Sequence, residues 1–408
     1  MKSKNKLKII NDPIYGFITV PTPLIFELIE HRYFQRLRRI TQMGMSYLVY
    51  PGAQHTRFHH ALGAMFLMQR AIQVLRFKQV AISEEESEAL LIAILLHDIG
   101  HGPFSHAMEH SLVEAVSHEH LSLLFMEQLN EQFDGRLQLA IDVFTDNYHR
   151  GFMHQLVSGQ LDMDRLDYLR RDSFFTGVTE GNVNSQRLIA MLNVKDDALV
   201  VEEKGIYSVE KFIVARRLMY WQVYLHKTGL VAEQLLVRVL QRAKELYRSG
   251  VTVNCSEALE LFLSKNVPSE SFDLNLLETF AQLDDIDILS AMKSWRNHPD
   301  WVLAQLSNRI LDRTLLRIKV KDKPFDPVRL EKKRQKLMKR HNLSQSEASY
   351  LVFGGTISNQ AYSMEKENIN LIRKNGKVID VAKASDQLNI EALSQLVVKH
   401  YICYPKND

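Results

Sequence analysis

The stretch "LLHDIGHGPFSHAMEH", residues 95–110, holds four histidines and two acidic residues within sixteen positions. Imidazole nitrogens and carboxylate oxygens bind divalent metals and transfer protons near neutral pH. These groups either surround a surface turn or line a metal site. The apolar run "ALLIAILL" leads directly into His97 and Asp98, which places both near the core, where an unpaired carboxylate is costly. This position weakens the interpretation as a surface turn, and both interpretations stay open on these residues alone.

Other candidate ligands lie in two separate segments. "HTRFHHALG" supplies His59 and His60, and "LDMDRLDYLRRD" supplies four aspartates, Asp162, Asp164, Asp167 and Asp172. Neighbouring residues of a helix point about 100° apart, so His97 and Asp98 share an ion only if it lies between them, near the helix end. A donor set of histidine and aspartate without cysteine favours Mn, Fe, Ni, Zn or Mg.

Helix-period segments dominate residues 21 to about 320 and predict a mainly α-helical body. The start of one helix is well marked, because Ser83 and Glu86 form a capping box. That helix should continue to His97 and end before Gly100 and Gly102-Pro103, which stop helices. Between two β-prone pieces, Asp196-Asp197 predicts a short hairpin.

The pattern changes after residue 320. "KDKPFDPVRLEKKRQKLMKRH" predicts a charged helix, and three later segments look strand-rich, with Asn375-Gly376 typical of a type I′ hairpin turn. We therefore expect a catalytic body over residues 1–320 and a small α+β lobe over residues 321–408.

Composition excludes some classes of protein. With 51 basic and 48 acidic residues in 408, the net charge of +3 gives no support to nucleic-acid binding. The basic run "EKKRQKLMKRH" lacks interleaved aromatic residues and is typical of a solvated helix face. Two cysteines form neither a zinc pattern nor a disulfide framework, and the start lacks a signal peptide, so we expect a cytoplasmic protein. The longest apolar run is too short to span a membrane.

The ordered set "HTRFHH", "HDIGHGPFSH", "SHEH" and "DMDRLDYLRRD" resembles the HD-domain metal-dependent phosphohydrolases, in particular their dNTP triphosphohydrolase branch. The similarity runs from "INDPIYGFI" to "YLHKTG", roughly residues 9 to 230. It implies an HD-domain helical bundle that holds one divalent metal ion. The implied ligands are His60, His97, Asp98 and Asp164.

The resemblance also separates His59 from His60. The family has an arginine three residues before the ligand histidine, and Arg57 therefore selects His60. His59 is then an ordinary helix histidine.

Further roles follow from the resemblance. His101 and His118 correspond to acid–base residues, oriented by Glu109 and Glu119, since a carboxylate raises the basicity of an imidazole. Glu109 replaces the aspartate that is usual there. Implied contacts to the attacked phosphate are Arg57 and His106; contacts to the outer phosphates are Arg165, Arg216 and Lys227; contacts to the deoxyribose are Gln42, Tyr168, Asp172 and Tyr224.

In the same branch, nucleotides bind at subunit junctions and assemble oligomers. Asn11, Glu30, Gln35 and Arg38 lie where such an effector site would be, although a helix with polar outer residues explains them nearly as well. We expect a homo-oligomer, dimer or tetramer, and a possible nucleotide effector.

The sequence thus predicts hydrolysis of dNTPs to a deoxynucleoside and tripolyphosphate. One alternative keeps the HD site but acts on nucleoside monophosphates, cyclic nucleotides or other phosphoesters. Another is a nucleotide-binding or nucleic-acid-binding regulator with weak catalysis. Gln42, Asp172 and Tyr224 favour the dNTP substrate, and the ligand set together with His101 and His118 favours an enzyme.

Overall fold

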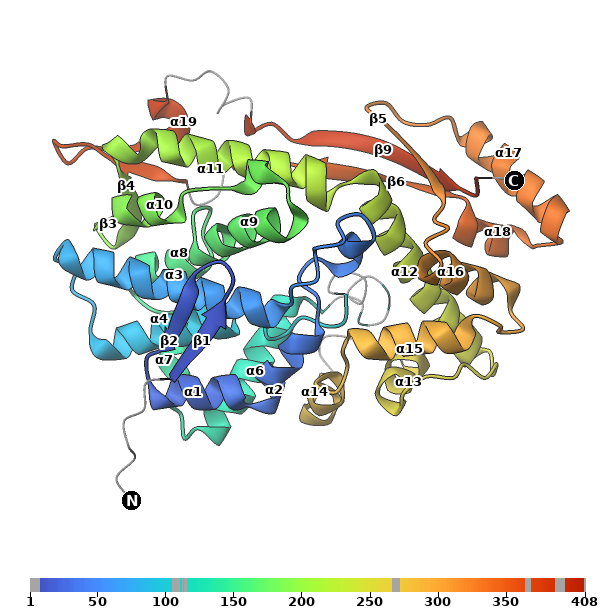
Figure 1. Cartoon of the computed structure of the whole chain (residues 1–408), viewed down its shortest axis with the longest axis horizontal. Coiled ribbons are helices and arrows are strands. Elements are labelled where there is room, and N and C mark those ends of the chain that lie inside the picture. Colours follow the sequence, from blue (N-terminus) through green and yellow to red (C-terminus); the bar gives the residue numbers. More distant parts are fainter. Residues whose placement is uncertain are drawn as a thin grey trace.

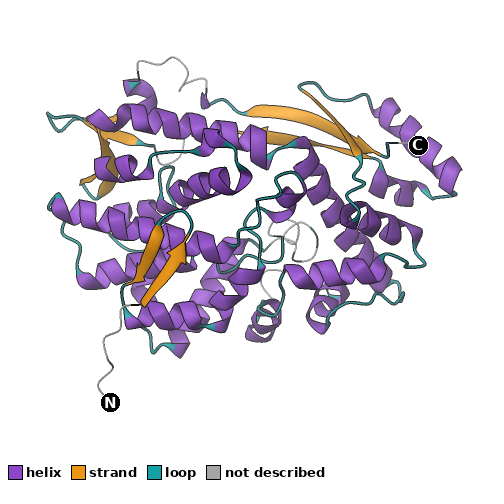
Figure 2. Cartoon of the chain, in the orientation of Figure 1, coloured by secondary structure: helices purple, strands orange, loops and turns teal. Residues whose placement is uncertain are grey.

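The computed structural model describes residues 8–104, 111, 113, 116–265, 272–363, 368–385 and 393–406. His106 and Glu109, two of the predicted site residues, lie outside the described residues. Helices dominate the described part, and the strands form small sheets, so the predicted mainly α fold is confirmed (Figure 2). Among the described helices, none is long and apolar enough to cross a membrane.

Three helices position the candidate site. They are α3 (Arg57–Phe77), α4 (Glu84–Leu96) and α9 (Met163–Thr176), and α3 packs against both of the others. The approach of α3 to α9 requires Gly63, because a Cβ there would lie 2.1 Å from Asp167 Oδ1. The ends of these helices therefore meet in the core.

The predicted capping box of α4 is present. Ser83 Oγ accepts a hydrogen bond from Glu86 N at 3.0 Å, and Glu86 Oε2 accepts one from Ser83 N at 2.8 Å. Every residue from Ala89 to Leu96 is buried, and the helix ends with His97 at its C-cap. This packing explains why His97 and Asp98 are held close to the core.

The N-terminal elements precede these helices, and β2 and η1 pack against α3 (Figure 1). The antiparallel hairpin of β1 and β2 leads into short helical turns. Their bounds are β1 Lys8–Asp12, β2 Gly16–Val20, α1 Pro23–Glu30, α2 Arg32–Gln35, η1 Arg36–Arg39 and η2 Gly44–Leu48.

The middle of the chain adds helices and one hairpin. That hairpin, β3 with β4, turns at Asp196 (φ 51°) and Asp197 (φ 55°), and two successive positive φ angles define a type I′ turn. The bounds are α6 His118–Gln132, α7 Gln138–Phe144, α8 Gly151–Val157, η3 Thr179–Gly181, α10 Ser185–Met191, β3 Leu192–Lys195, β4 Ala198–Glu202 and η4 Glu203–Gly205.

The following helices complete the body. A π-helical turn, η5 (Tyr220–Tyr224), separates α11 (Ile206–Met219) from the long helix α12 (Lys227–Arg248). Next come α13 Glu257–Ser264, α14 Leu274–Phe280, α15 Asp285–Trp295 and α16 Trp301–Leu311.

The C-terminal elements include α17 (Pro327–His341), the predicted charged helix. Two sheets connect this part to the body. The first has the strand order β5-β9-β6 and lies along one edge of the molecule (Figure 1). In the second, β7 pairs with β4 of the body and with β8. The bounds are β5 Arg317–Lys321, α18 Gln345–Leu351, β6 Phe353–Asn359, β7 Asn370–Ile372, β8 Val378–Asp380, α19 Val381–Ala384 and β9 Val397–Tyr404. The division at residue 320 stays a prediction.

The turn between β7 and β8 differs from the prediction. Gly376 has a φ of 79°, but Asn375 is not among the residues with positive φ, so the turn is not type I′. Gly376 N donates to Arg373 O, and Arg373 N donates to Lys377 O, both at 2.9 Å. This pattern is a type I turn followed by a left-handed glycine, which needs only one positive φ.

Candidate active site

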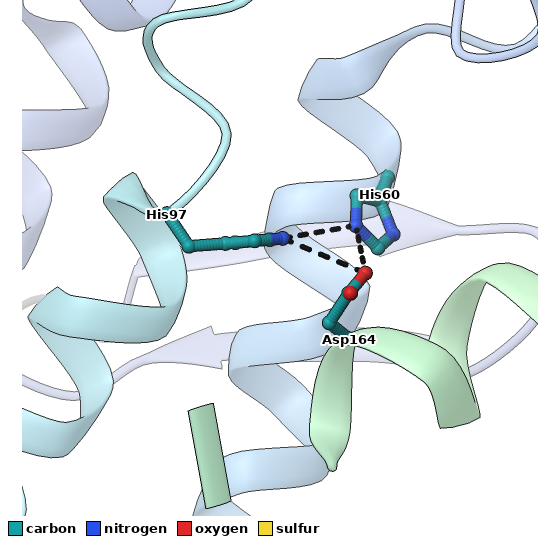
Figure 3. Close-up of side chains that lie close together, drawn as sticks. All are labelled: His60, His97 and Asp164. Carbon is teal, nitrogen blue, oxygen red and sulfur yellow. Dashed lines mark hydrogen bonds and ion pairs between the residues drawn. The ribbon is translucent and has the colours of Figure 1, made fainter. Parts of the chain in front are cut away.

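His60, His97 and Asp164 bring three donor atoms to one point (Figure 3). His60 Nε2 lies 3.1 Å from Asp164 Oδ1 and 3.3 Å from His97 Nε2, and His97 Nε2 lies 3.6 Å from Asp164 Oδ1. The three side chains come from α3, the end of α4 and the start of α9. Convergence of nitrogen and oxygen donors from rigid helices is suited to one divalent ion.

Asp98 connects this cluster to a second one. Its Oδ1 lies 3.4 Å from His97 Nε2 and 3.3 Å from His101 Nε2, and its Oδ2 lies 3.7 Å from His60 Nε2. The Arg57 guanidinium donates to the same Oδ2. The second cluster consists of Asp98, His101 and His118. Asp98 is therefore within reach of both the candidate ligands and the candidate acid–base pair.

The electrostatics of the cluster fit a cation. Burial opposes the charged form of His60, but hydrogen bonds to Asp164 and Asp167 outweigh it and raise its pKa to about 10. The charge of Asp98 likewise raises the pKa of His97 against the effect of burial. Hydrogen bonds to the two imidazoles hold the pKa of Asp164 far below its usual range despite burial. In the absence of a metal, the imidazoles of His60 and His97 therefore favour their protonated, positively charged form at the place where a metal ion would carry the positive charge.

A buried chain of charged groups supports His60 from behind. Its Nδ1 donates to Asp167 Oδ2 at 2.8 Å, and Arg171 donates to both oxygens of Asp167, at 2.9 and 3.0 Å. Arg171 also donates to Asp12 Oδ2 at 2.8 Å. A carboxylate on one imidazole nitrogen fixes the tautomer that presents the other nitrogen to a metal. The sequence offered Asp167 as a candidate ligand, but its carboxylate lies behind His60 instead, and it gave Arg171 no role, although the spacing of four residues is typical of a helical ion pair.

His59 has a local structural role. Its Nδ1 accepts a hydrogen bond from Thr56 N at 3.2 Å, which completes a capping box at the start of α3. The imidazole of His59 thus caps the N-terminus of α3. This contact agrees with the interpretation of His59 as a helix histidine.

A cavity of about 700 Å³ opens beside the cluster. Most of the predicted site residues that the structure describes line it, and Tyr220 and Glu233, which sequence reasoning missed, line it as well. His60 does not line the cavity but lies fully buried beneath it. The predicted residues at the wall are Gln42, Arg57, His97, Asp98, His101, His118, Glu119, Asp164, Arg165, Tyr168, Asp172 and Tyr224.

His101 and His118 stack face to face in this cavity. Their ring centroids are 3.9 Å apart with an angle of 16° between the planes, and His118 Nε2 lies 3.2 Å from Glu119 Oε1. Burial, followed by the charge of Arg57, lowers the pKa of His101 well below its usual value. His101 is therefore neutral at pH 7 and able to accept a proton.

The cavity extends along α9. Asp164, Tyr168 and Asp172 follow each other at intervals of four residues, so Asp172 lies about 12 Å from Asp164 at roughly 1.5 Å per residue. We call the region of His60, His97, Asp98 and Asp164 the metal end of the cavity. The far end consists of Gln42, Asp172 and Tyr224, with the buried His55 behind Asp172.

At the far end, two groups already bind the Asp172 carboxylate. His55 Nε2 lies 2.7 Å from Asp172 Oδ1, and the Tyr224 hydroxyl donates to Oδ2 at 2.8 Å. The rings of Tyr168 and Tyr224 meet edge to face, 6.1 Å apart. By contrast, Gln42 Oε1 is buried without a hydrogen-bond partner among the described residues. This acceptor is available to a bound molecule that carries a donor.

The three cationic residues that are predicted to contact the outer phosphates differ in position. Arg165 lines the cavity, but its guanidinium also donates to Gly159 O and to the buried Asp162. Arg216 is half-buried, 5.9 Å from the Tyr220 ring, and Lys227 is exposed at the start of α12. Neither Arg216 nor Lys227 lines the cavity in this structure.

Comparisons with known proteins fit this geometry. The HD domain family matches residues 57–172, and the family of the HD associated region matches residues 183–254. A phosphohydrolase from Bacteroides thetaiotaomicron has a crystal structure that is 50% identical in sequence, with a TM-score of 0.94, covering 98% of this chain and all of that one. The chain belongs to the HD-domain phosphohydrolase family.

Two relatives known by sequence extend the comparison. The uncharacterized protein YwfO of Bacillus subtilis is 30% identical over 98% of this chain and 92% of its own length. The deoxynucleoside triphosphate triphosphohydrolase SAMHD1 homolog of Dictyostelium discoideum is 32% identical over 60% of this chain, and the chain covers 51% of that protein. The similarity to the Dictyostelium protein thus concerns about half of its length.

Within this HD-domain protein, the two family matches divide the cavity. The HD match begins at Arg57 and ends at Asp172, and therefore includes the four candidate ligands and the stacked histidines. Tyr220, Tyr224 and Glu233 fall in the HD associated region, and Gln42 precedes both. The metal end is made by the HD domain alone, whereas the far end also needs neighbouring segments.

The four predicted effector residues lie near the start of the chain. Asn11 is exposed in β1, and Glu30 is exposed at the end of α1. Gln35 donates to Ile29 O at 2.8 Å and accepts from Arg38 Nε at 2.8 Å. Arg38 stacks on Phe58, 3.6 Å from the ring centroid. Nucleotide binding by these residues stays a prediction.

Proposed function

We propose that this HD-domain phosphohydrolase is a metal-dependent dNTP triphosphohydrolase. Water attacks the α-phosphorus, and the products are a deoxynucleoside and tripolyphosphate. The observation that carries the proposal is the extent of one cavity. It joins a His/Asp cluster and a stacked histidine pair at the metal end to the Asp172–Tyr224 pair and Gln42 at the far end.

The metal end supplies the groups that phosphate hydrolysis requires. His60, His97 and Asp164, with Asp98 adjacent, would hold one divalent ion, which when bound polarises a phosphoryl oxygen and activates water. Arg57 faces the same region and would neutralise charge on the phosphate, a task that suits a planar guanidinium.

The stacked histidines would move the protons. Neutral His101 accepts a proton from the attacking water as the new bond from oxygen to the α-phosphorus forms. His118, paired with Glu119, would donate a proton to the 5′ oxygen of the deoxynucleoside as its bond to the α-phosphorus breaks. The reaction then releases the three linked phosphates as one product.

The far end supports a nucleoside over leaving groups that carry no sugar hydroxyl. Asp172, fixed by His55 and Tyr224, and the unpartnered Gln42 Oε1 can accept hydrogen bonds from a sugar hydroxyl. A site built to bind a hydroxyl strongly rejects an analogue that lacks it, because its buried groups lose their partner. The name of the Dictyostelium relative, a deoxynucleoside triphosphate triphosphohydrolase, supports the same substrate class.

A nucleotide panel tests the proposal. Metal-loaded protein is incubated with each dNTP and each NTP, and the products are separated by ion chromatography. We expect a deoxynucleoside and tripolyphosphate from dNTPs and much slower turnover of NTPs. Turnover of nucleoside monophosphates, cyclic nucleotides or other phosphoesters alone would contradict the proposal and favour the alternative HD-domain substrates.

Oligomerisation and an effector nucleotide belong to the same proposal. The four residues near the start of the chain lie on or near the surface, where a second subunit could complete a nucleotide site. Gel filtration and rate measurements with and without dGTP or GTP test this part. An unchanged mass together with an unchanged rate would contradict this part. The proposal that the protein hydrolyses dNTPs does not depend on it.

A further inference from the structure

Asp285 lies outside the HD domain match, yet it contacts two segments that form the cavity wall. The residue is only 5% exposed. Oδ2 accepts hydrogen bonds from the Thr41 N–H and the Thr41 hydroxyl, each at 2.8 Å, and Oδ1 accepts one from the Phe104 N–H at 2.8 Å. One side chain therefore ties together residues that are more than sixty positions apart in the chain.

This use of Asp285 is not explained by helix capping. The cap of α15 is Asp284, whose side chain accepts from Ile286 N at 2.9 Å. Asp287 completes the capping box, with Oδ2 accepting from Asp284 N at 2.9 Å. The helix start is satisfied without Asp285, so its three hydrogen bonds serve the cavity segments.

Arg36 makes a second connection between the same three parts of the chain. Its guanidinium donates to Leu283 O at 3.2 Å and to Ile99 O at 2.8 Å, and it is almost fully buried, between the rings of Phe125 and Phe280. Arg36 thus joins the segment before α15, at Leu283, to the chain just after Asp98, at Ile99. Two independent contacts indicate a fixed junction.

The residues that Asp285 holds are adjacent to groups of the cavity. Thr41 precedes Gln42, and Gln42 N donates to His55 O at 3.0 Å, so a shift of Thr41 moves the far end. Phe104 lines the cavity three residues after His101 and has a φ of 48°, a left-handed conformation that is strained for phenylalanine. Such a conformation persists only where neighbouring contacts hold it.

We propose that Asp285 is a positioning residue that fixes the Gln42 segment relative to the Phe104 segment, and so sets the width of the cavity for the nucleotide. The inference rests on the proposed function for its substrate. In the described part of the chain, Asp285 makes no hydrogen bond or ion pair with the four candidate metal ligands. Loss of the junction should therefore weaken nucleotide binding while metal binding is retained.

Asp285→Asn is the main test variant. An amide keeps the shape but offers one oxygen in place of two, so either the Thr41 or the Phe104 contact is lost. We expect KM for dNTPs to rise about tenfold, kcat to change less than about threefold, and the metal content to stay at the wild-type level. Thr41→Val, which removes only the hydroxyl contact, should raise KM less.

Asp287→Asn is the matched control, because it removes a carboxylate from the same helix start without touching either cavity segment. Hydrogen exchange of the Thr41 and Phe104 amides, measured without nucleotide, should be faster in Asp285→Asn than in Asp287→Asn. This readout tests the junction even if the wild type does not hydrolyse dNTPs, a result that would overturn the proposed function alone. Equal exchange in the two variants would overturn the inference, as would a loss of kcat at unchanged KM.

Discussion

The two ends of the cavity are built differently. At the metal end, His60 is backed by buried ion pairs that run through Asp167 and Arg171 to Asp12, and its Nε2 lies 3.1 Å from Asp164 Oδ1. At the far end, Asp172 is shared between His55 and Tyr224, and Gln42 Oε1 has no partner among the described residues. The first arrangement is preorganised for an ion, and the second leaves hydrogen-bonding capacity for a ligand.

This difference separates the expected effects of mutation. Changes at the metal end should remove the ion and with it most of the activity, whereas changes at the far end should alter KM and substrate choice. The predictions below test that separation.

Asp98→Ala should have the largest effect. Asp98 contacts candidate ligands and the candidate proton acceptor His101, so its loss weakens metal binding and disturbs the acid–base pair. We expect turnover to fall by at least about 10³-fold. Initial rates and metal content by mass spectrometry measure the effect, and circular dichroism checks the fold. Wild-type activity in this variant would refute the site.

Metal affinity should depend strongly on pH. In the metal-free protein the pKa of His60 is raised to about 10, so at pH 7 its proton must leave when the metal binds. Because the folded-state pKa lies above neutrality, affinity should rise with pH up to about 10. The expected gain is about tenfold per pH unit for one released proton, or about 100-fold between pH 6 and pH 8. Metal titrations in two buffers measure both the affinity and the proton release. An affinity that is constant over this range would contradict the proton count.

Asp167→Asn tests the support behind His60. The amide cannot neutralise the positive charge of Arg171, and it cannot fix the His60 tautomer as the carboxylate does. We expect metal affinity to fall by about 10-fold to 100-fold, the usual range for partners behind a ligand histidine. Competition with a chelator measures it. Asp172→Asn, on the same helix, is the control and should leave metal affinity unchanged.

Tyr224→Phe should have the smallest effect. It removes one hydrogen bond to Asp172 and leaves the aromatic wall in place. We expect KM for dNTPs to rise about fivefold to tenfold, with metal affinity unchanged. Tyr50→Phe is a matched control, since the Tyr50 hydroxyl donates to Gln222 O and does not line the cavity. If Tyr224→Phe lost metal instead, the two ends would not be independent.

Local signals in the sequence predicted much of the fold. The capping box of Ser83 and Glu86, the hairpin at Asp196-Asp197 and the helical body all depend on residues close in the chain. The turn at Asn375-Gly376 was wrongly assigned, because Asn-Gly also fits a type I turn with one left-handed glycine. Local patterns could not distinguish the two turns.

The candidate site was predicted less completely. His60, His97 and Asp164 come together as the motifs implied, since each motif places its residue at a helix end or on one helix face. Asp12, Arg36 and Asp285 gave no signal, because their partners are distant in the chain and appear only after folding. Glu233 was missed for the same reason, being brought to the cavity by the packing of α12.

The central claim is that water attacks the α-phosphorus of a dNTP held between the two ends. Hydrolysis of dGTP in ¹⁸O-labelled water, followed by mass spectrometry of both products, tests it most directly. The account predicts one ¹⁸O atom in tripolyphosphate and none in deoxyguanosine, because the bond between the α-phosphorus and the 5′ oxygen breaks. Release of pyrophosphate or orthophosphate in place of tripolyphosphate, or a label in deoxyguanosine, would contradict it.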